Sequence, residues 1–154
     1  MSGVPIFTLL LNEVKTNAAI VIGSTARVFV NPSRGLREEL ANDASKMYSN
    51  IFTDKVGSKK VNLFTEKEFD LEVHTWVKAD TDDSAREKAV LLDAQIQEQI
   101  LPLSSSVRQY AQYFEEQSAG CSDILYYSEG LCVAISRYHV KFRHAYGKPT
   151  QQNP

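Results

Sequence analysis

The stretch that decides the fold reads FDLEVHTWVK and occupies residues 69–78. Within the longer segment that begins at Asn62, apolar residues take odd positions and acidic residues take even ones, which is the period-two pattern of a half-buried strand. The apolar set is Phe69, Leu71, Val73 and Val77, and the acidic row is Glu66, Glu68, Asp70 and Glu72. The sequence therefore predicts one long strand in a sheet that has a solvated or partner-facing side.

A strong amphipathic helix follows this strand and extends to Leu101. The acidic turn at residues 78–84 separates the two elements, and Ser84 and Glu87 have the spacing of a capping box. The apolar residues that repeat at helical spacing are Ala85, Ala89, Leu92, Ile96 and Ile100. A long strand that leads into a helix indicates an α+β scaffold.

The remaining segments complete this scaffold. We expect helices at residues 5–17 and 107–114, strands at 27–30, 47–52, 124–127 and 131–146, and turns at 31–35 and 55–60. Residues 36–45 fit either one helical turn or a loop. In the last strand the apolar positions change from odd to even, which predicts a bulge or sharp twist near Ser136 or Arg137.

Together these elements predict a single α+β domain over residues 1–146. Its sheet should be mostly antiparallel or mixed, with four to five strands and two to three helices packed on one face. A chain of 154 residues can form one hydrophobic core of this kind. Residues 147–154 have lost their apolar content, so we expect a flexible C-terminal tail.

Composition limits the class of protein further. No apolar run approaches the roughly 18 to 20 residues that span a bilayer, and no export signal is evident, so we expect no membrane partner. Cys121 and Cys132 could meet across a hairpin, although buried free thiols are the preferred interpretation. The net charge of −2 is segregated along the chain, because residues 130–154 carry +4 and residues 1–129 carry −6.

No catalytic motif interrupts the predicted elements. The three histidines lack metal-ligand spacing, neither cysteine has a neighbouring base, and phosphate-binding glycine motifs are missing. Asp80, Asp82 and Asp83 lack the glycine and distant glutamate of a calcium loop and suit a helix N-terminus better. We therefore predict no enzyme, with no catalytic residue, metal site or cofactor.

A basic row on the last strand complements the acidic row. Its members are Arg137, His139, Lys141 and Arg143. The preferred interpretation places the two strands side by side, so that the rows pair laterally. Alternatively, one row crosses a subunit boundary, where complementary rows on opposite edges would orient the partners. Sequence-reading contact of the basic row with nucleic acid is disfavoured by the acidic pI of about 5.9. Trp76, on the acidic face, is either a covered aromatic or an interface anchor.

Four stretches of the chain resemble the tail terminator (tail completion) proteins of long-tailed bacteriophages, including the lambda-like minor tail protein U class. The first two stretches are ARVFVNP at residues 26–32, after an N-terminal helix, and FDLEVHTWVKAD at residues 69–80. The others are the helix of residues 85–101 and the final strand YHVKFRHAYGKP at residues 138–149. The resemblance covers nearly the whole chain and consists of fold-pattern features.

This resemblance implies a structural virion protein of the tail or neck, assembled in the host bacterial cytoplasm. It implies a hexameric ring that stops tail tube polymerisation and offers a docking face to the head connector, with DNA passing through the lumen without sequence-specific contact. Ring contacts would then involve both rows, chiefly Arg137, Lys141 and Arg143 on the basic one, together with Trp76. Arg34 and Arg37 would face a neighbouring ring or the lumen. Two alternatives stay open: a neck or head-completion protein that binds the portal complex, and a small ligand-binding module with a pocket that joins His74 to His139.

Overall fold

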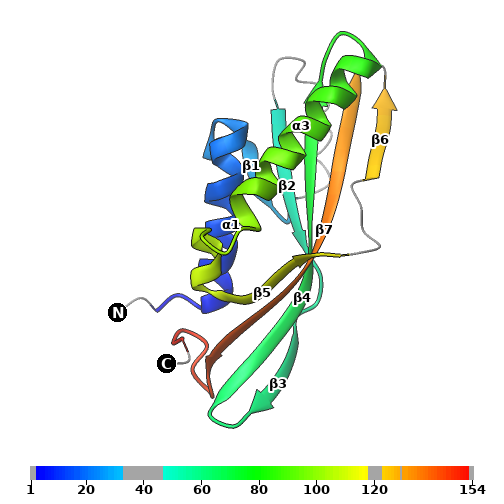
Figure 1. Cartoon of the computed structure of the whole chain (residues 1–154). Helices are drawn as coiled ribbons and strands as arrows, with labels where there is room; N and C mark the ends of the chain where they lie inside the picture. Colours follow the sequence, from blue (N-terminus) through cyan, green and yellow to red (C-terminus); the bar gives the residue numbers. More distant parts are fainter. Residues whose placement is uncertain (1–2, 33–46, 118–122, 129, 153–154) are drawn as a thin grey trace.

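The computed structural model describes residues 3–32, 47–117, 123–128 and 130–152, and for residues 123–128 only the backbone. Within them, two α-helices lie on one face of a strongly twisted mixed sheet of seven strands (Figure 1). The helices are α1 (Ile6–Ile22) and α3 (Asp82–Ile100), and the strands are β1 (Val28–Val30), β2 (Met47–Thr53), β3 (Gly57–Val61), β4 (Phe64–Lys78), β5 (Ala111–Glu116), β6 (Asp123–Ser128) and β7 (Leu131–Ala145). The predicted α+β fold is confirmed, with more strands than the four to five expected.

Strands β4 and β7 form the centre of the sheet. The main order is β1-β2-β4-β7-β5, with β3 paired to β4 and β6 paired to β7. Among the described strands only β1 and β2 run parallel; the other neighbours are antiparallel. The two central strands are 15 residues long and stay in register from the pair Phe64 and Ala145 to the pair Lys78 and Leu131. Every charged position of β4 therefore has a defined neighbour on β7.

Of the two alternatives predicted near Ser136 or Arg137, a bulge or a sharp twist, the bulge is wrong, because the register of β7 against β4 is unbroken there. The first half of β7 is instead buried on both faces. Its odd residues Leu131, Val133 and Ile135 form a cluster on the side away from the helices, while Cys132 and Ala134 pack under α3. The apolar residues of β7 thus change from odd to even positions where the face away from the helices becomes exposed. The register of the strand does not change there.

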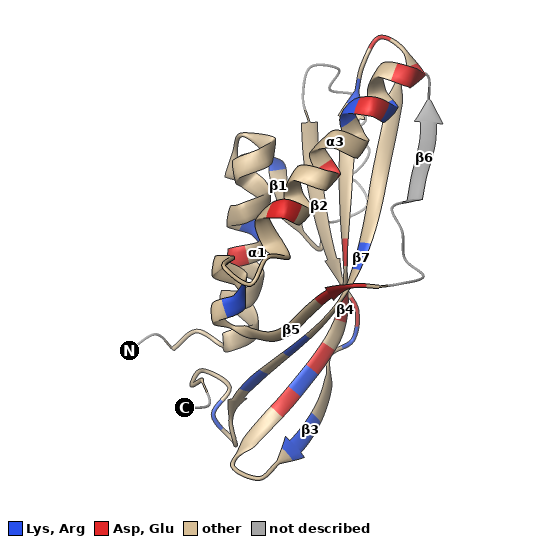
Figure 2. Cartoon of the chain, in the orientation of Figure 1, with Lys and Arg blue, Asp and Glu red and all other residues tan. Residues whose placement is uncertain are grey.

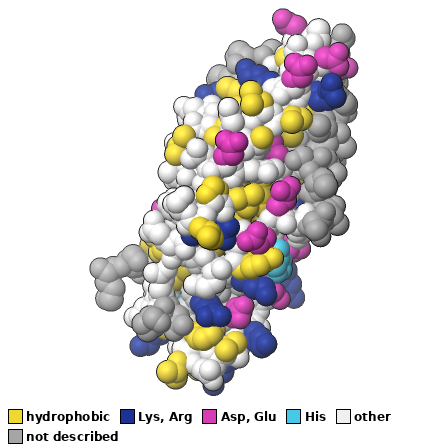
Figure 3. All heavy atoms as spheres, viewed as in Figure 1, with side chains coloured by type: hydrophobic (Ala, Val, Ile, Leu, Met, Phe, Trp, Pro, Cys, Tyr) yellow, Lys and Arg dark blue, Asp and Glu magenta, His cyan; other side chains and the backbone are white. Residues whose placement is uncertain are grey.

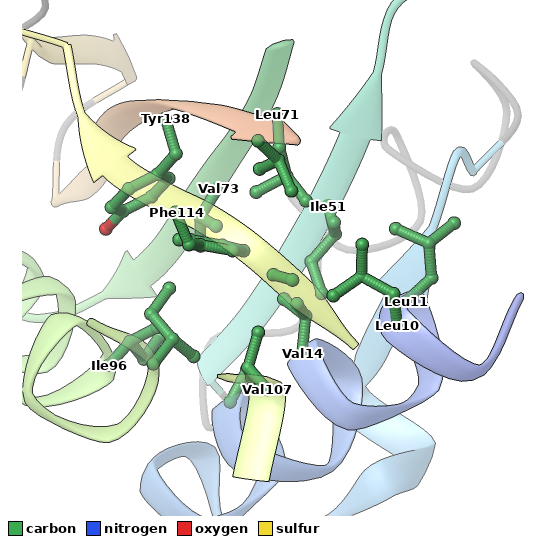
Figure 4. Close-up of a cluster of buried hydrophobic side chains, with 14 of the residues drawn as sticks. Leu10, Leu11, Val14, Ile51, Leu71, Val73, Ile96, Val107, Phe114 and Tyr138 are labelled. Carbon is green, nitrogen blue, oxygen red and sulfur yellow. The ribbon is translucent and has the colours of Figure 1, made fainter. Parts of the chain in front are cut away.

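The main core lies between the helices and the sheet (Figure 4). Leu10 and Val14 of α1, Leu71 and Val73 of β4, Ile96 of α3, Phe114 of β5 and Tyr138 of β7 are among its members. Complete burial of one such large side chain contributes roughly 1.5–3 kcal/mol. This packing seals the helix-covered face of the sheet and leaves the lower half of the opposite face open.

Both helices begin close to where their sequences suggest, but α1 ends later than predicted. Helix α1 follows Pro5 and continues five residues past the predicted end at Asn17, to Gly23, whose φ of 97° stops it. The cap of α3 is Thr81, not Ser84: the Thr81 side chain accepts a hydrogen bond from the backbone N–H of Ser84. Asp82 and Asp83 then lie in the first turn, where they favour the helix dipole.

Two predicted segments have a different structure. Residues 107–114 form a short 3-10 helix and strand β5, not an α-helix. A register shift between Ala111 and Tyr113 lets Ala111 and Phe114 face the core three residues apart, which imitates helical spacing. Residues 57–60 of the turn expected at 55–60 belong to strand β3, and the turn to β4 lies at Asn62 and Leu63.

The C-terminal segment, predicted to be a flexible tail, packs against the domain as far as residue 152. The backbone N–H of Ile6 donates to the carbonyl oxygen of Pro149 at 2.9 Å, and Ala145 N–H donates to Gln151 at 2.8 Å. The Gln152 amide donates to the carbonyl oxygen of Gln109 at 2.6 Å. These bonds hold the segment against the N-terminal end of α1 and the connection into β5.

Candidate interface on the charged face of the sheet

The register of β4 and β7 brings the two charged rows directly opposite each other. The cross-strand pairs are Glu66 with Arg143, Glu68 with Lys141, Asp70 with His139, and Glu72 with Arg137. Red and blue segments accordingly lie side by side on the lower halves of both strands (Figure 2). We call this surface the charged face. The rows pair laterally within one chain, and they do not lie on opposite edges of the sheet.

Glu72 anchors the upper end of the charged face. Nε of Arg137 donates to Oε1 of Glu72 at 3.0 Å, and Nε2 of His74 lies 2.9 Å from Oε2. Burial raises the pKa of the Glu72 carboxyl, but the hydrogen bonds from His74 and Arg137 lower it by more, so that the pKa lies below its usual 4.5. The carboxylate of Glu72 is therefore ionised more readily than that of a free glutamate.

His139 bridges two carboxylates in the middle of the charged face. Its Nδ1 lies 2.7 Å from Oδ1 of Asp70, and its Nε2 lies 3.3 Å from Oε2 of Glu68. Both ring nitrogens can donate to carboxylates at once only when the imidazole is protonated. The hydrogen bond to Asp70 raises the pKa of His139 most, burial opposes this, and the bond to Glu68 adds to the rise. The charge of His139 thus depends on pH.

The lower end of the charged face carries charges without an ion pair in the described residues. Glu66 and Arg143 face each other, yet neither forms a salt bridge there; the guanidinium of Arg143 lies 4.3 Å from the centre of the Phe64 ring. Lys59 of β3 is the other cross-strand neighbour of Glu66. A pocket of about 290 Å³ lies here, and its lining includes Lys59, Glu66 and Lys141. At this end the Arg143 guanidinium thus packs on the Phe64 ring, while Glu66 forms no ion pair within the described residues.

The charged face is a surface, not a buried network. Ion pairs on this face join Glu68, Asp70 and Glu72 to Arg137, His139 and Lys141, and the side chains of all six residues are 33–55% exposed. Acidic and basic side chains are interspersed over the lower half of the molecule (Figure 3). Exposed cross-strand pairs contribute only about 0.2–1 kcal/mol each, so the fold does not depend on any one of them.

Trp76 lies on the same side of the sheet but at its upper end. It is 5% exposed and packs in a cluster with Tyr48, Val133 and Ile135. The side chain of Trp76 is therefore covered by other residues of the same chain.

Arg34 and Arg37 lie outside the described residues, so their predicted contacts remain hypotheses. Residues 36–45, for which the sequence fits either a helical turn or a loop, also lie outside the described residues.

Sequence reasoning missed two residues of this surface. Tyr113, 42% exposed, stands edge-on to His139 with ring centroids 6.0 Å apart and lies near the ammonium of Lys141. The predicted helix at 107–114 was wrong, and for that reason Tyr113 was not assigned to the sheet surface. The alternation of Tyr113 with the core residue Phe114 could have indicated a strand with Tyr113 on its exposed side. Asp54, between the predicted strand at 47–52 and the predicted turn at 55–60, accepts a hydrogen bond from the backbone N–H of Asp70 at 2.7 Å.

Other predicted features can be placed as well. A pocket of about 300 Å³ beside Glu72 and Arg137 has a lining that includes neither His74 nor His139, so it does not join the two histidines.

Cys132 is a buried free thiol whose pKa is raised by burial, and Cys121 lies outside the described residues. In the described part of the chain, no group of three or more His, Cys, Asp and Glu is arranged to hold a metal ion.

Neither helix of the described ranges combines the length and the apolar content that a bilayer crossing requires. A comparison with models of protein families gives no match, and a search of curated proteins gives no significant relative.

Proposed function

We propose that this chain is a structural virion protein, a tail terminator that assembles as a hexameric ring on the head-proximal end of a phage tail tube. The ring ends tube polymerisation and offers a docking face to the head connector, while DNA passes through the lumen without sequence-specific binding. The protein assembles in the bacterial cytoplasm and remains in the tail or neck of the virion. The family resemblance of residues 26–32, 69–80, 85–101 and 138–149 suggests this role.

The observation that carries the proposal is the exposed charged face on a sheet whose other face is sealed by helices. A subunit of a ring needs a rigid surface that fixes the orientation of its neighbour. Charged side chains across such a contact select the correct partner and orientation more than they add affinity. The central strands β4 and β7 hold these side chains in a fixed register.

The lower end of the charged face is the part best suited to contact a neighbour. Most acids in the middle of the face already have a basic partner in the same chain, so they are less available to a second subunit. Glu66 and Arg143 form no ion pair within the described residues, and Lys59 beside them is exposed. We assign the primary ring contact to these three residues, with Glu68 and Lys141 next to them.

The test is solution mass by light scattering, first on the protein alone and then with purified phage tail tubes. A hexamer, or a monomer that forms a ring only on tube ends, supports the proposal. A persistent monomer that ignores tubes contradicts it. Binding to a portal complex with no affinity for tubes would identify a neck protein instead.

A further inference from the structure

An apolar pocket lies on the helix-covered side of the sheet, where the N-terminal end of α1 and the C-terminal segment meet beside the lower parts of β4 and β7 (Figure 1). The apolar part of its lining consists of Pro5, Phe7, Val56, Phe142 and Pro149. The rings of Phe7 and Phe142 stack with their centroids 5.7 Å apart, and the backbone N–H of Ile6 donates to the carbonyl oxygen of Pro149 at 2.9 Å. These contacts between separate elements hold the walls of the pocket in place.

Lys67 of β4 brings a positive charge to this lining. The residues directly opposite it on the two neighbouring strands, Ser58 of β3 and Phe142 of β7, carry no charge. The side chain of Lys67 is half-buried, and its flexible stem of four carbon atoms lets the ammonium reach a group at the mouth of the pocket. A ligand that fills the pocket can therefore place an anionic group against this ammonium.

Two more lysines lie on the same side of the sheet. Lys60 of β3 is opposite Thr65 of β4, and Thr65 lies two residues before Lys67, so all three side chains share one face. Lys148 directly precedes Pro149, which lines the pocket. Lys60 and Lys148 are both exposed. They add to the positive potential that an anion meets on approach.

The elements that border the pocket carry their acidic residues elsewhere. Strand β3 contains none, and neither do residues 141–152. On β4, Glu66 and Glu68 alternate with Lys67 and therefore belong to the charged face on the other side. Helix α1 has one acid, Glu13, about two turns from its first residue. The surroundings of the pocket are thus positive, although the whole chain has a net charge of −2.

We propose that this pocket binds a small organic anion, which has an apolar body of the size of one ring and a carboxylate that pairs with the ammonium of Lys67. The volume of about 230 Å³ sets the size, because a cavity of roughly 150 Å³ accepts benzene and pockets for drug-sized ligands start at roughly 300 Å³. The ring packs against Phe7 and Phe142. The inference does not depend on ring assembly of the protein, because Lys67 lies on the face opposite the charged face.

The test is an NMR titration of the full chain with p-toluate and, in parallel, with p-toluamide, a neutral ligand of the same shape. A partly exposed ion pair makes p-toluate bind about twofold to tenfold more tightly than the amide. Resonances of Phe7 and Phe142 should move with both ligands. Equal affinities, no binding of p-toluate, or shifts confined to other parts of the protein would overturn the proposal.

The variant Lys67→Met keeps an unbranched apolar stem and removes the ammonium. It should bind the two ligands with nearly equal affinity. Lys88→Met is the matched control, because Lys88 is exposed on α3, which contributes no described residue to the lining, and its loss changes the net charge equally. This control should keep the preference for p-toluate. If Lys67→Met keeps it as well, or if both variants lose it, Lys67 does not hold the carboxylate and the proposal is wrong.

A second measurement covers the case in which Lys67→Met fails to fold. In the wild-type protein, the resonances of the Lys67 side chain next to the ammonium should move with p-toluate and stay in place with p-toluamide. The preference for p-toluate should also decrease as salt is added, because screening weakens an exposed ion pair. Unmoved Lys67 resonances, or a preference that salt leaves unchanged, would overturn the proposal.

Discussion

The charge reversal Glu68→Lys tests whether the charged face mediates assembly. Glu68 lies 3.3 Å from Nε2 of His139 and 4.0 Å from Nζ of Lys141, and its side chain is 55% exposed. Each contact of this kind is worth about 0.2–1 kcal/mol, and the reversed charge adds repulsion of similar size. We therefore expect a loss of about 1 kcal/mol in the free energy of unfolding, against a typical total of about 5–15 kcal/mol. The folded monomer should survive.

The effect on assembly should be much larger than the effect on folding. If Glu68 contacts a neighbouring subunit, the reversal replaces attraction by repulsion at every contact of the ring. A cost of about 2 kcal/mol per contact weakens each association roughly 30-fold. Light scattering over a concentration series, with and without tail tubes, measures this loss, and urea unfolding of the same samples confirms that the fold is intact.

Glu87→Lys is the matched control for this experiment. Glu87 is exposed on α3, on the helix-covered side, and its reversal changes the net charge by the same amount. We expect this variant to assemble like the wild type. If Glu68→Lys assembles as well as Glu87→Lys does, the charged face is not the ring contact and the assignment is wrong.

Three further predictions concern stability. Gly130→Ala places a Cβ in overlap with the carbonyl oxygen of Ala79 at a φ of +74°, so we expect a loss of about 3 kcal/mol or more in the free energy of unfolding, measured with urea. Gly147→Ala, with a φ of +71° and open space around the added Cβ, should lose only about 1 kcal/mol. Equal losses would show that the contact with Ala79 does not matter. Ser136→Ala removes the 2.6 Å hydrogen bond to the buried carboxylate of Asp93 and should lower the unfolding free energy by about 1–3 kcal/mol. Ser49→Ala is the control: Ser49 is equally buried, but its hydroxyl has no hydrogen-bond partner in the described residues. This variant should have an unchanged or higher unfolding free energy. The stabilising effect of His139 should be fully present below its unfolded pKa of 6.5 and should fade as pH rises through the higher folded pKa. The difference in unfolding free energy between the wild type and His139→Gln should therefore shrink at alkaline pH. A difference that grows with pH would contradict the protonated bridge.

The central strands could be predicted from sequence because a single rule governs them. Alternation along residues 66–77 has one physical cause, the pleat of a half-buried strand, and the structure has β4 there. The same rule located the charged residues on one face. It also made lateral pairing the preferred arrangement, since complementary rows on two long strands lower the energy of the sheet only when the strands are neighbours.

The errors arise where two physical causes produce the same spacing. Core residues three or four apart indicate a helix, but in β5 a register shift puts Ala111 and Phe114 on one face of a strand. The apolar pattern of β7 changes parity because both of its faces are buried near Leu131 and only one is buried near Phe142. Periodicity reports which side chains are buried, and it does not report which neighbour buries them.

The lateral pairing of the two rows changes where recognition by a second molecule has to occur. An acidic row without basic neighbours would attract any basic surface. Here Arg137 already forms an ion pair with Glu72, and His139 with Asp70. Four acids and three permanent bases, with His139 as the fourth cation when protonated, make the charged face nearly neutral. Long-range attraction is therefore weak, and specificity has to come from the pattern of alternating charges and from the Glu66 and Arg143 end, where no ion pair forms in the described chain. A contact of this kind is sensitive to register more than to salt. Reversing Glu66 alone should consequently impair assembly more than reversing Glu72, although Glu72 makes the stronger bonds within the chain.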